Sequence, residues 1–213
     1  GIPQNRERVF IIGSRLNNAP ASEIIKDILK SQTKKWFVLK DVLYGLPQLK
    51  NKEEKNNSKI ENEEIGLKYR KYSYKGTAFE KFINHEKVNY LFNHINRYNN
   101  KRDIEIYKRL PQGANSLHES IQDIMPYKDR NHMFKDKYFK LNENEVSKTI
   151  TSHMKYDCNM YIHPSESRGL SPREAARIQT FPDDFVFMGS NNNRYAQIGN
   201  AVPVKLAEVI GKS

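Results

Sequence analysis

The sequence predicts an α/β chain, and three features of it indicate this fold class. Residues 9–12 are four consecutive apolar residues followed by a glycine, which is typical of a strand covered on both faces. Residues 22–32 carry Ile and Leu at the spacing of one helical face. Residues 171–174 read Ser-Pro-Arg-Glu, which places an N-cap, a proline at the first helical position and a capping-box acid in register.

The first expected element is a strand over residues 1–13. Because successive side chains alternate between the two faces of a strand, Gln4, Arg6 and Arg8 are expected to project from the same face. What two arginines on one face of a buried strand bind is not evident from these residues alone.

Further elements follow along the first half of the chain. A helix is expected over residues 22–32, with Ser22 as its N-cap. A short apolar run covers 36–46, and the mixed charges of 48–65 predict an exposed excursion or helix. The alternation in 68–76 is typical of a half-exposed strand.

Residues 66–110 hold most of the positive charge of the chain. They contain eleven Lys and Arg against four Asp and Glu, while the formal net charge of the whole sequence is +11. Tyr69, Tyr72 and Tyr74 are interleaved with these cations, and a basic, aromatic-rich surface suits phosphates and unstacked bases. In the alternative interpretation, the aromatic residues form the core of this region and the lysines its solvated face.

The composition excludes several classes of protein and favours one kind of partner. No apolar run approaches the roughly 18 residues of a membrane span, so no membrane partner is expected. The single Cys158 excludes an internal disulfide and a cysteine-based zinc site, and the six histidines show no helical pairing with an acid. No metal is therefore expected. The positive charge favours nucleic acid, unless it only reflects a Lys- and Asn-rich genome.

The last part of the sequence predicts two helices. Residues 149–163 are expected as strands or extended chain, before the helix that starts at Pro172. Residues 189–195 are expected as a polar loop. A second helix is expected to open at Pro203 and to stop at Gly211. Its apolar face would consist of Val202, Leu206, Val209 and Ile210.

Three blocks of the sequence resemble a known family. GIPQNRERVFIIG (1–13), RGLSPREAARIQTFPDDF (168–185) and YAQIGNAVP (195–203) are similar, in this order, to motifs VIII, IX and X of the DNA (cytosine-5) methyltransferases. The family places its target recognition region between motifs VIII and IX, where this chain carries its basic residues. Two further segments also look like sequences that flank or enter this region, DVLYGLPQL (41–49) and RDIEIYKRLPQGAN (102–115).

The resemblance implies a fold and a division of the chain. The chain would be the C-terminal part of a Rossmann-like domain that uses S-adenosyl-L-methionine, together with a mixed α+β target recognition domain. Residues 1–40 would be the last strand and helix of the catalytic domain, residues 41–190 the target recognition domain with motif IX, and residues 191–213 a return to the catalytic domain.

The resemblance also implies roles for the arginines near the amino terminus. In the family, a target cytosine is flipped out of the duplex into a pocket. Arg8 would reach the O2 edge of that cytosine, and Arg6 would help to order the catalytic loop and phosphates. A guanidinium suits these tasks because it is a fixed fork of donors that keeps its charge. The alternative is an arginine pair that forms salt bridges with carboxylates of a missing segment.

The corner around Asn200 is implied to form part of the wall of the cofactor pocket. Asn200, just before an expected helix start, would present backbone N–H groups and an amide to the methionyl carboxylate of S-adenosyl-L-methionine, beside Ala201 and Val202. A hydroxyl residue often stands at the position of Ala201 in the family, so one hydrogen bond is in doubt. Alternatively, Asn200 is only a turn residue after Gly199.

Double-stranded DNA is the expected partner of the basic region. Gly113 is a candidate turn near the DNA, since glycine permits close backbone approach. Arg168, Arg173 and Arg177 are expected to be scaffolding, as motif IX has a mainly structural role in the family. The expected DNA-binding residues are Gln4, Lys68, Arg70, Lys71, Lys75, Arg109 and Gly113.

The sequence lacks residues that the family's chemistry requires. A cysteine nucleophile after proline, a glutamate in Glu-Asn-Val and a Gly-x-Gly strand do not occur, and Cys158 stands in Tyr-Asp-Cys-Asn. The chain alone is therefore expected to be inactive, and a missing N-terminal catalytic half, in the same chain or a partner subunit, is the second expected partner. We expect a bacterial or phage restriction-modification enzyme in the cytosol or nucleoid. The alternatives are a non-catalytic recognition module and an enzyme that acts on RNA.

Overall fold

The computed structural model describes residues 1–13, 15, 20–31, 36–55, 62, 66–126 and 136–213. Helices and strands are both present, which confirms the mixed content expected from the sequence. The helices are α1 Ala21–Lys30, α2 Leu39–Leu43, α3 Ala78–Ile83, α4 Lys101–Arg109, α5 Pro172–Ile178, α6 Asn191–Asn200 and α7 Val204–Lys212. The strands are β1 Gly66–Lys71 and β2 Tyr90–Ile95, and short 3-10 helices are η1 Glu119–Ile121, η3 Ser152–Lys155 and η4 Asn159–Tyr161.

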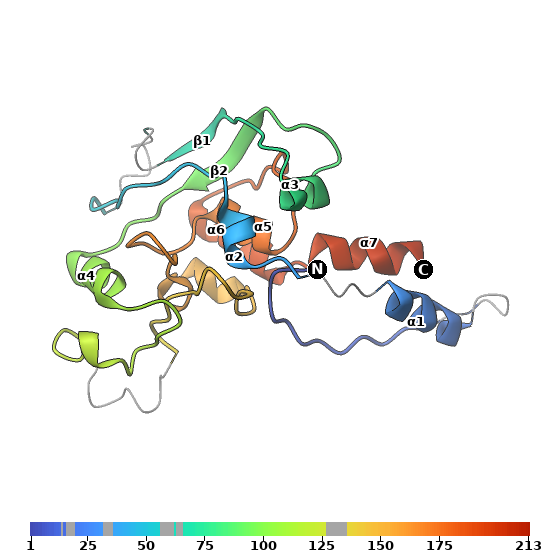
Figure 1. Ribbon diagram of the computed structural model, residues 1–213, viewed down its shortest axis with the longest axis horizontal. Coiled ribbons are helices and arrows are strands. Elements are labelled where there is room, and N and C mark those ends of the chain that lie inside the picture. Colours follow the sequence, from blue (N-terminus) through green and yellow to red (C-terminus); the bar gives the residue numbers. More distant parts are fainter. Residues whose placement is uncertain (14, 16–19, 32–35, 56–61, 63–65, 127–135) are drawn as a thin grey trace.

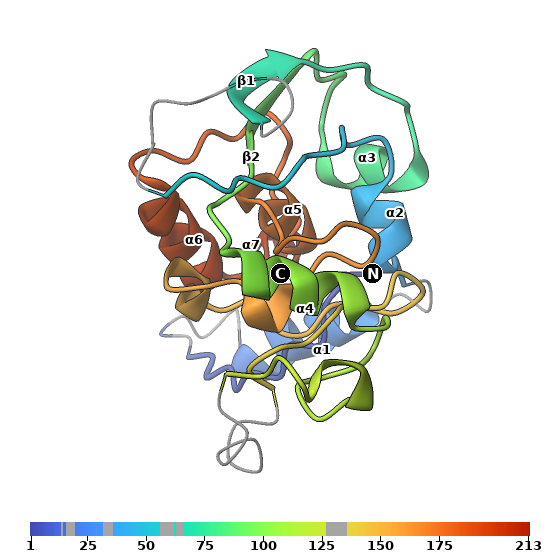
Figure 2. The same ribbon diagram turned by 90° about the vertical axis from the view of Figure 1, so that its left-hand side faces the viewer.

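The two strands form an antiparallel pair that lies against α5. Gly66 is opposite Ile95, and Lys71 is opposite Tyr90. Leu91 and Ile95 of β2 are buried, β2 is in contact with α5, and Figures 1 and 2 show the pair above this helix. Every residue of α5 is buried, so this short helix is the centre around which the other elements pack.

The start of α5 follows the sequence prediction in detail. The Ser171 hydroxyl accepts a hydrogen bond from the Glu174 backbone N–H, and the Glu174 carboxylate accepts one from the Ser171 backbone N–H. This reciprocal capping satisfies two donors that a helix start otherwise leaves unpaired. A second box of the same kind, formed by Thr77 and Glu80, starts α3.

Helices α1 and α7 lie side by side at one end of the molecule, to the right in Figure 1. The helix expected at 22–32 is confirmed as α1, but its N-cap is Pro20 rather than Ser22, so no side chain caps it. The second expected helix is α7, with Pro203 as its N-cap, and Gly211 lies inside it rather than ending it. Neither helix has a buried residue.

The apolar run near the amino terminus is not the buried strand that its sequence predicts. Val9 is 90% exposed and Ile11 is 96% exposed. Within the described part of the chain no strand pairs with residues 9–12, and an unpaired extended segment cannot bury its backbone. Extended pairing occurs only earlier, where Gln4 forms a parallel bridge with Ser147.

Other expectations on local structure need correction. Residues 149–163 contain η3 and η4 instead of strands, and residues 191–195 belong to α6 instead of a loop, because Ser190 caps that helix. The predicted strand at 68–76 is confirmed only as far as Lys71. Residues 56–61 and 63–65 of the charged excursion lie outside the described residues.

Candidate functional site

The amino-terminal segment is tied to the far end of the chain by two glutamines. The buried Gln4 donates from its amide to the side-chain oxygen of Gln179 and accepts from the Ile150 backbone N–H at 3.2 Å. Gln179 in turn donates to the carbonyl oxygens of Ile198 at 2.8 Å and Ala201 at 3.2 Å. Gln4 is thus engaged within the protein instead of standing free for DNA.

Arg6 continues this connection. One terminal nitrogen of its guanidinium donates to the Ile150 carbonyl at 2.6 Å, and the other donates to the Ala201 carbonyl at 3.4 Å. Partial burial, followed by the nearby charge of Arg8, lowers the pKa of Arg6. Arg8 is exposed, and its guanidinium donates to the backbone carbonyl of Glu7.

An open groove lies where these residues meet α7. Its volume is about 890 Å³, and its lining comes from the amino-terminal segment, α1 with the following Ser31, Trp36, Phe82 of α3, and residues at the start and along the length of α7. The two arginines lie in the same wall as exposed aromatic side chains, so the groove combines positive charge with apolar surface. The lining residues that matter for the argument are Arg6, Arg8, Phe10, Trp36, Val202 and Leu206.

The corner between α6 and α7 differs from the geometry that the sequence suggested. Asn200 is the exposed last residue of α6 and does not precede a helix start directly. The Ala201 backbone N–H donates to Ile198, and those of Val204 and Lys205 donate to Gln179 and to the Thr180 hydroxyl. These N–H groups are therefore not free for a carboxylate. Val202, 48% exposed, does line the groove.

The expected DNA-binding residues do not gather in one place. Lys68, Arg70 and Lys71 lie on β1, and Lys75 lies on the exposed connection that leads to α3. Lys68, Lys71 and Lys75 are exposed. Of the three tyrosines interleaved with them, Tyr69 is 64% exposed, whereas Tyr72 is buried and donates to Glu80. The burial of Tyr72 agrees with the core interpretation, and the binding of DNA by the exposed cations and Tyr69 stays a prediction.

Arg109 and Gly113 lie on and just beyond α4, away from the β1–β2 pair (Figure 1). The Arg109 guanidinium donates to Glu105 at 2.8 Å and to Asp123 at 2.9 Å. Its charge is therefore shared with two carboxylates. Gly113 has a φ of +78°, which confirms the expected turn, and a Cβ at this position would meet no atom within 4 Å.

The three arginines of the block at 168–185 are fully buried and act as scaffolding, as expected. Arg173 donates to the carbonyls of Phe92, Pro182 and Phe185, and thereby joins β2 to the segment after α5. Arg177 binds Asp183 and also donates to the Val42 carbonyl of α2. A planar fork of donors can hold several backbone segments at once, which a lysine cannot.

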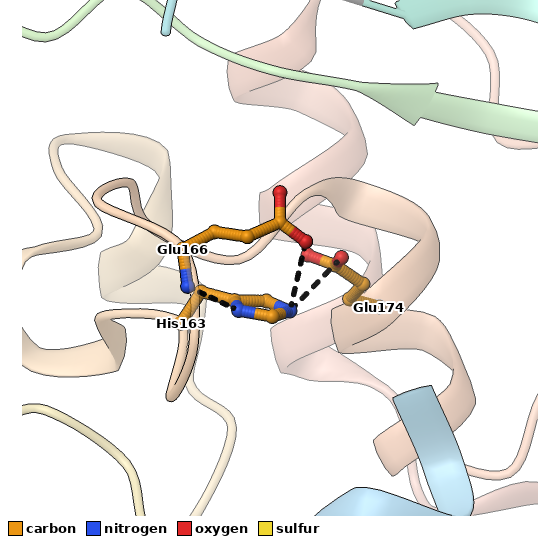
Figure 3. A group of neighbouring side chains, drawn as sticks. All are labelled: His163, Glu166 and Glu174. Atoms are coloured by element: carbon orange, nitrogen blue, oxygen red, sulfur yellow. Dashed lines mark hydrogen bonds and ion pairs between the residues drawn. The ribbon is translucent and has the colours of Figure 1, made fainter. Parts of the chain in front are cut away.

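His163, Glu166 and Glu174 form a largely buried cluster (Figure 3), and Arg168 forms ion pairs with both of its carboxylates. Among the described residues this is the group with the donor atoms and spacing of a metal site. The backbone N–H groups of Ser165 and Glu166 donate to Nδ1 of His163, so its proton is on Nε2, 3.6 Å from Glu174. Both carboxylates bind Arg168, and the cluster is therefore an ion-pair network rather than a set of free ligands.

Burial lowers the pKa of His163 to about 3, although Glu174 opposes this shift. Burial by itself would raise the pKa of Glu174, but the Arg168 guanidinium outweighs it and holds that pKa well below its usual range. The cluster thus contains a neutral histidine and an ionised carboxylate at neutral pH.

The single cysteine is not placed to act as a nucleophile. Cys158 is fully buried, and burial raises the pKa of its thiol. A Cβ on Gly169 would lie 2.3 Å from the Cys158 Cβ, so the two segments pack in direct contact.

A comparison with known proteins identifies the family. The profile of C-5 cytosine-specific DNA methylases matches residues 1–213, the whole chain. The chain belongs to the C-5 cytosine-specific DNA methylase family. The resemblance found in the sequence is thereby confirmed.

Individual members of the methylase family match over different lengths. A type II methyltransferase of Methanothermobacter thermautotrophicus is 31% identical over 216 residues, which cover 100% of this chain and 52% of the relative. One of Bacillus paralicheniformis is 29% identical over 229 residues, covering 100% and 48%. One of a Psychrobacter species is 69% identical over 51 residues, covering 24% and 12%. The chain spans about half the length of the curated relatives that match it throughout.

A solved structure shares the fold. A DNA modification methyltransferase encoded within a prophage of E. coli superposes with a TM-score of 0.58 at 24% sequence identity, covering 84% of this chain and 46% of the other. Among the described residues, no helix is long and apolar enough to cross a membrane.

Sequence reasoning missed Gln179, which binds Gln4, and Ile150, which accepts a hydrogen bond from Arg6. Gln179 is in one of the recognised blocks, but its partners are 175, 19 and 22 residues away along the chain. No local pattern could have indicated them.

Proposed function

We propose that this chain supplies the DNA-recognising part, and one wall of the target pocket, of a DNA (cytosine-5) methyltransferase from a restriction-modification system. The main support is the groove that Arg6 and Arg8 line together with Val202, since these residues come from opposite ends of a 213-residue sequence. Such convergence is what a shared pocket for base and cofactor requires.

The two arginines would have different tasks in this pocket. Arg8 has an exposed guanidinium that can donate to the O2 atom of a flipped cytosine. Arg6 is held by the Ile150 and Ala201 carbonyls, so it would fix the wall against which the base and the catalytic loop rest. A fixed donor near a developing charge is more effective than a mobile one because little reorganisation is needed.

S-adenosyl-L-methionine would supply the methyl group when bound. In this chain the exposed amide of Asn200 would donate to its methionyl carboxylate, and Val202, beside Ala201, would provide apolar contact. The backbone N–H groups of Ala201, Val204 and Lys205 already have acceptors within the protein, so the side chain of Asn200 would carry the polar part of the interaction.

The nucleophile and much of the cofactor site would come from the catalytic half. Cys158 is buried, and no other cysteine exists in the chain. Val9, Ile11 and Trp36, with exposed fractions of 90%, 96% and 62%, form an apolar surface beside the groove that suits this partner. The segments 1–40 and 191–213 would belong to that catalytic unit, and 41–190 to the recognition domain.

Double-stranded DNA would contact the exposed cations of the β1–β2 region. Lys68, Lys71 and Lys75 are suited to backbone phosphates, which give affinity without sequence information. Arg109 is a weaker candidate because two carboxylates already bind it.

A methyl-transfer assay tests the proposal. The protein expressed from the complete source gene, with any partner subunit, is incubated with methyl-labelled S-adenosyl-L-methionine and duplex DNA, in parallel with the 213-residue chain. We expect label on C5 of cytosine with the complete protein, none with the chain alone, and a strong loss in Arg8→Ala. Label on another atom, or methylation by the chain alone, would overturn it.

A further inference from the structure

The turn formed by residues 152–157 carries a cluster of three side chains, of which His153 and Tyr156 are exposed and Lys155 is half-buried. The Tyr156 ring is 64% exposed. The ammonium of Lys155 lies 4.8 Å from the centre of that ring, and the His153 ring packs against it with centroids 5.2 Å apart. A lysine held over an aromatic ring keeps its charge at a defined place on the surface.

Arg97 holds this turn in place through hydrogen bonds to its backbone. The guanidinium of Arg97 donates to the carbonyls of Met154 and Tyr156, both at 2.8 Å, and lies 5.5 Å above the Tyr195 ring of α6. It thereby satisfies carbonyl oxygens at the end of η3 that the short helix leaves unpaired. The half-buried guanidinium of Arg97 thus holds the turn together with the turn's own backbone hydrogen bond from Tyr156 to His153.

The turn is connected to the groove through Arg6, which lines the groove. Ile150, two residues before η3, accepts the hydrogen bond of Arg6. The backbone of Thr151 and Ser152 touches Gly199 so closely that a Cβ there would lie 2.1 Å from the Ser152 nitrogen.

The charges around the turn favour an anionic ligand. Within the part of the chain that the structure describes, no carboxylate forms a salt bridge with Lys155. The nearest acid in sequence, Asp157, accepts a hydrogen bond from the Asn159 backbone N–H at 3.0 Å. The ammonium of half-buried Lys155, a tyrosine hydroxyl and an imidazole together match the oxygen atoms of a phosphodiester.

We propose that Lys155, Tyr156 and His153 form a binding site for a DNA backbone phosphate close to the target cytosine, and that Arg97 is its positioning residue. This inference rests on the proposed function and adds a contact outside the basic region at 66–110. The phosphate contact would fix the position of the DNA strand relative to the groove that Arg6 lines.

The test measures binding of the 213-residue chain to duplex DNA across a range of salt concentrations. The slope of log K against log salt is negative, and loss of one phosphate contact decreases its magnitude by about 0.9. We expect this decrease in Lys155→Ala. We expect no comparable decrease in Lys26→Ala, which removes the same charge from an exposed position on α1. An unchanged slope in Lys155→Ala would refute the site.

Arg97→Lys tests the positioning role while it keeps the charge. We expect the salt dependence to weaken as much as in Lys155→Ala. Combining the two substitutions should weaken it no further, and neither substitution should change the unfolding midpoint. Additive losses would show that Arg97 acts independently of Lys155. If the unsubstituted chain does not bind DNA, both this site and the proposed recognition function are wrong, whereas binding with an unaffected Lys155→Ala removes the site alone.

Discussion

Gly199 of α6 packs directly against the backbone of Thr151 and Ser152, and its replacement by alanine is expected to lower the free energy of unfolding. An added Cβ would lie 2.1 Å from the Ser152 nitrogen, 2.2 Å from the Thr151 carbonyl carbon and 2.5 Å from its oxygen. These are backbone atoms, so no side chain can rotate to relieve the overlap. Either α6 or η3 must move by about 1 Å.

The magnitude follows from two opposing terms. Alanine is favoured over glycine in a helix by about 1 kcal/mol. Overpacking of a tight site costs about 1–3 kcal/mol and occasionally more, and an overlap with three backbone atoms belongs at the upper end. Gly199→Ala should therefore lower the free energy of unfolding by about 2 kcal/mol. With a urea m-value of about 2 kcal/mol per M, the midpoint falls by about 1 M.

Gly211 provides the matched control. It lies in α7, and a Cβ on it would meet nothing within 4 Å, so Gly211→Ala should leave stability unchanged or raise it by up to about 1 kcal/mol. Urea unfolding followed by circular dichroism at 222 nm measures both variants. If Gly199→Ala is as stable as the unsubstituted chain, α6 and η3 are not in the contact described here.

Three further predictions concern buried ionisable side chains. Arg177→Met should destabilise the fold by about 3–5 kcal/mol in urea unfolding, because it leaves the fully buried Asp183 unpaired, and a second substitution, Asp183→Asn, should recover part of the loss; no recovery would contradict the pairing. The pKa of His163 is lowered to about 3 in the folded chain against 6.5 in the unfolded one, so its contribution to stability is present above pH 6.5 and is lost as the pH falls. The expected loss is about 1.4 kcal/mol per pH unit below pH 6, and His163→Gln should flatten this dependence; an equally steep profile in the variant would refute the assignment. Cys158 should react with a thiol reagent at a measurable rate only in urea, since it is buried and its pKa is raised; rapid reaction of the folded chain would argue against that burial.

Local signals in the sequence predicted local structure well. The Ser171–Glu174 capping box depends only on residues three apart, and the structure contains it as expected. The apolar run at residues 9–12 was misjudged because a strand exists only through its neighbour, and the described chain provides none. The helix α6 was missed because polar residues at its start gave a loop-like pattern, whereas buried Tyr195 and Ile198 hold it in place.

The candidate site could be predicted only in outline. The blocks at the two ends of the sequence indicated which residues to expect, but not that Arg6 would bind the Ile150 and Ala201 carbonyls. Arg109 illustrates the opposite case, since its partner Asp123 is 14 residues away and removes a cation that the charge count had assigned to DNA. Contacts between distant residues depend on the fold, which charge and spacing alone do not determine.

The most direct test of the central claim, that this chain serves cytosine-5 methylation of DNA, is bisulfite sequencing of DNA from a host that lacks its own cytosine methylation and expresses the complete source gene. We predict 5-methylcytosine in one short sequence context and its disappearance when Arg8 is replaced by alanine. Methylation confined to adenine or to the exocyclic amine of cytosine, or DNA without any methylated cytosine, would contradict the account.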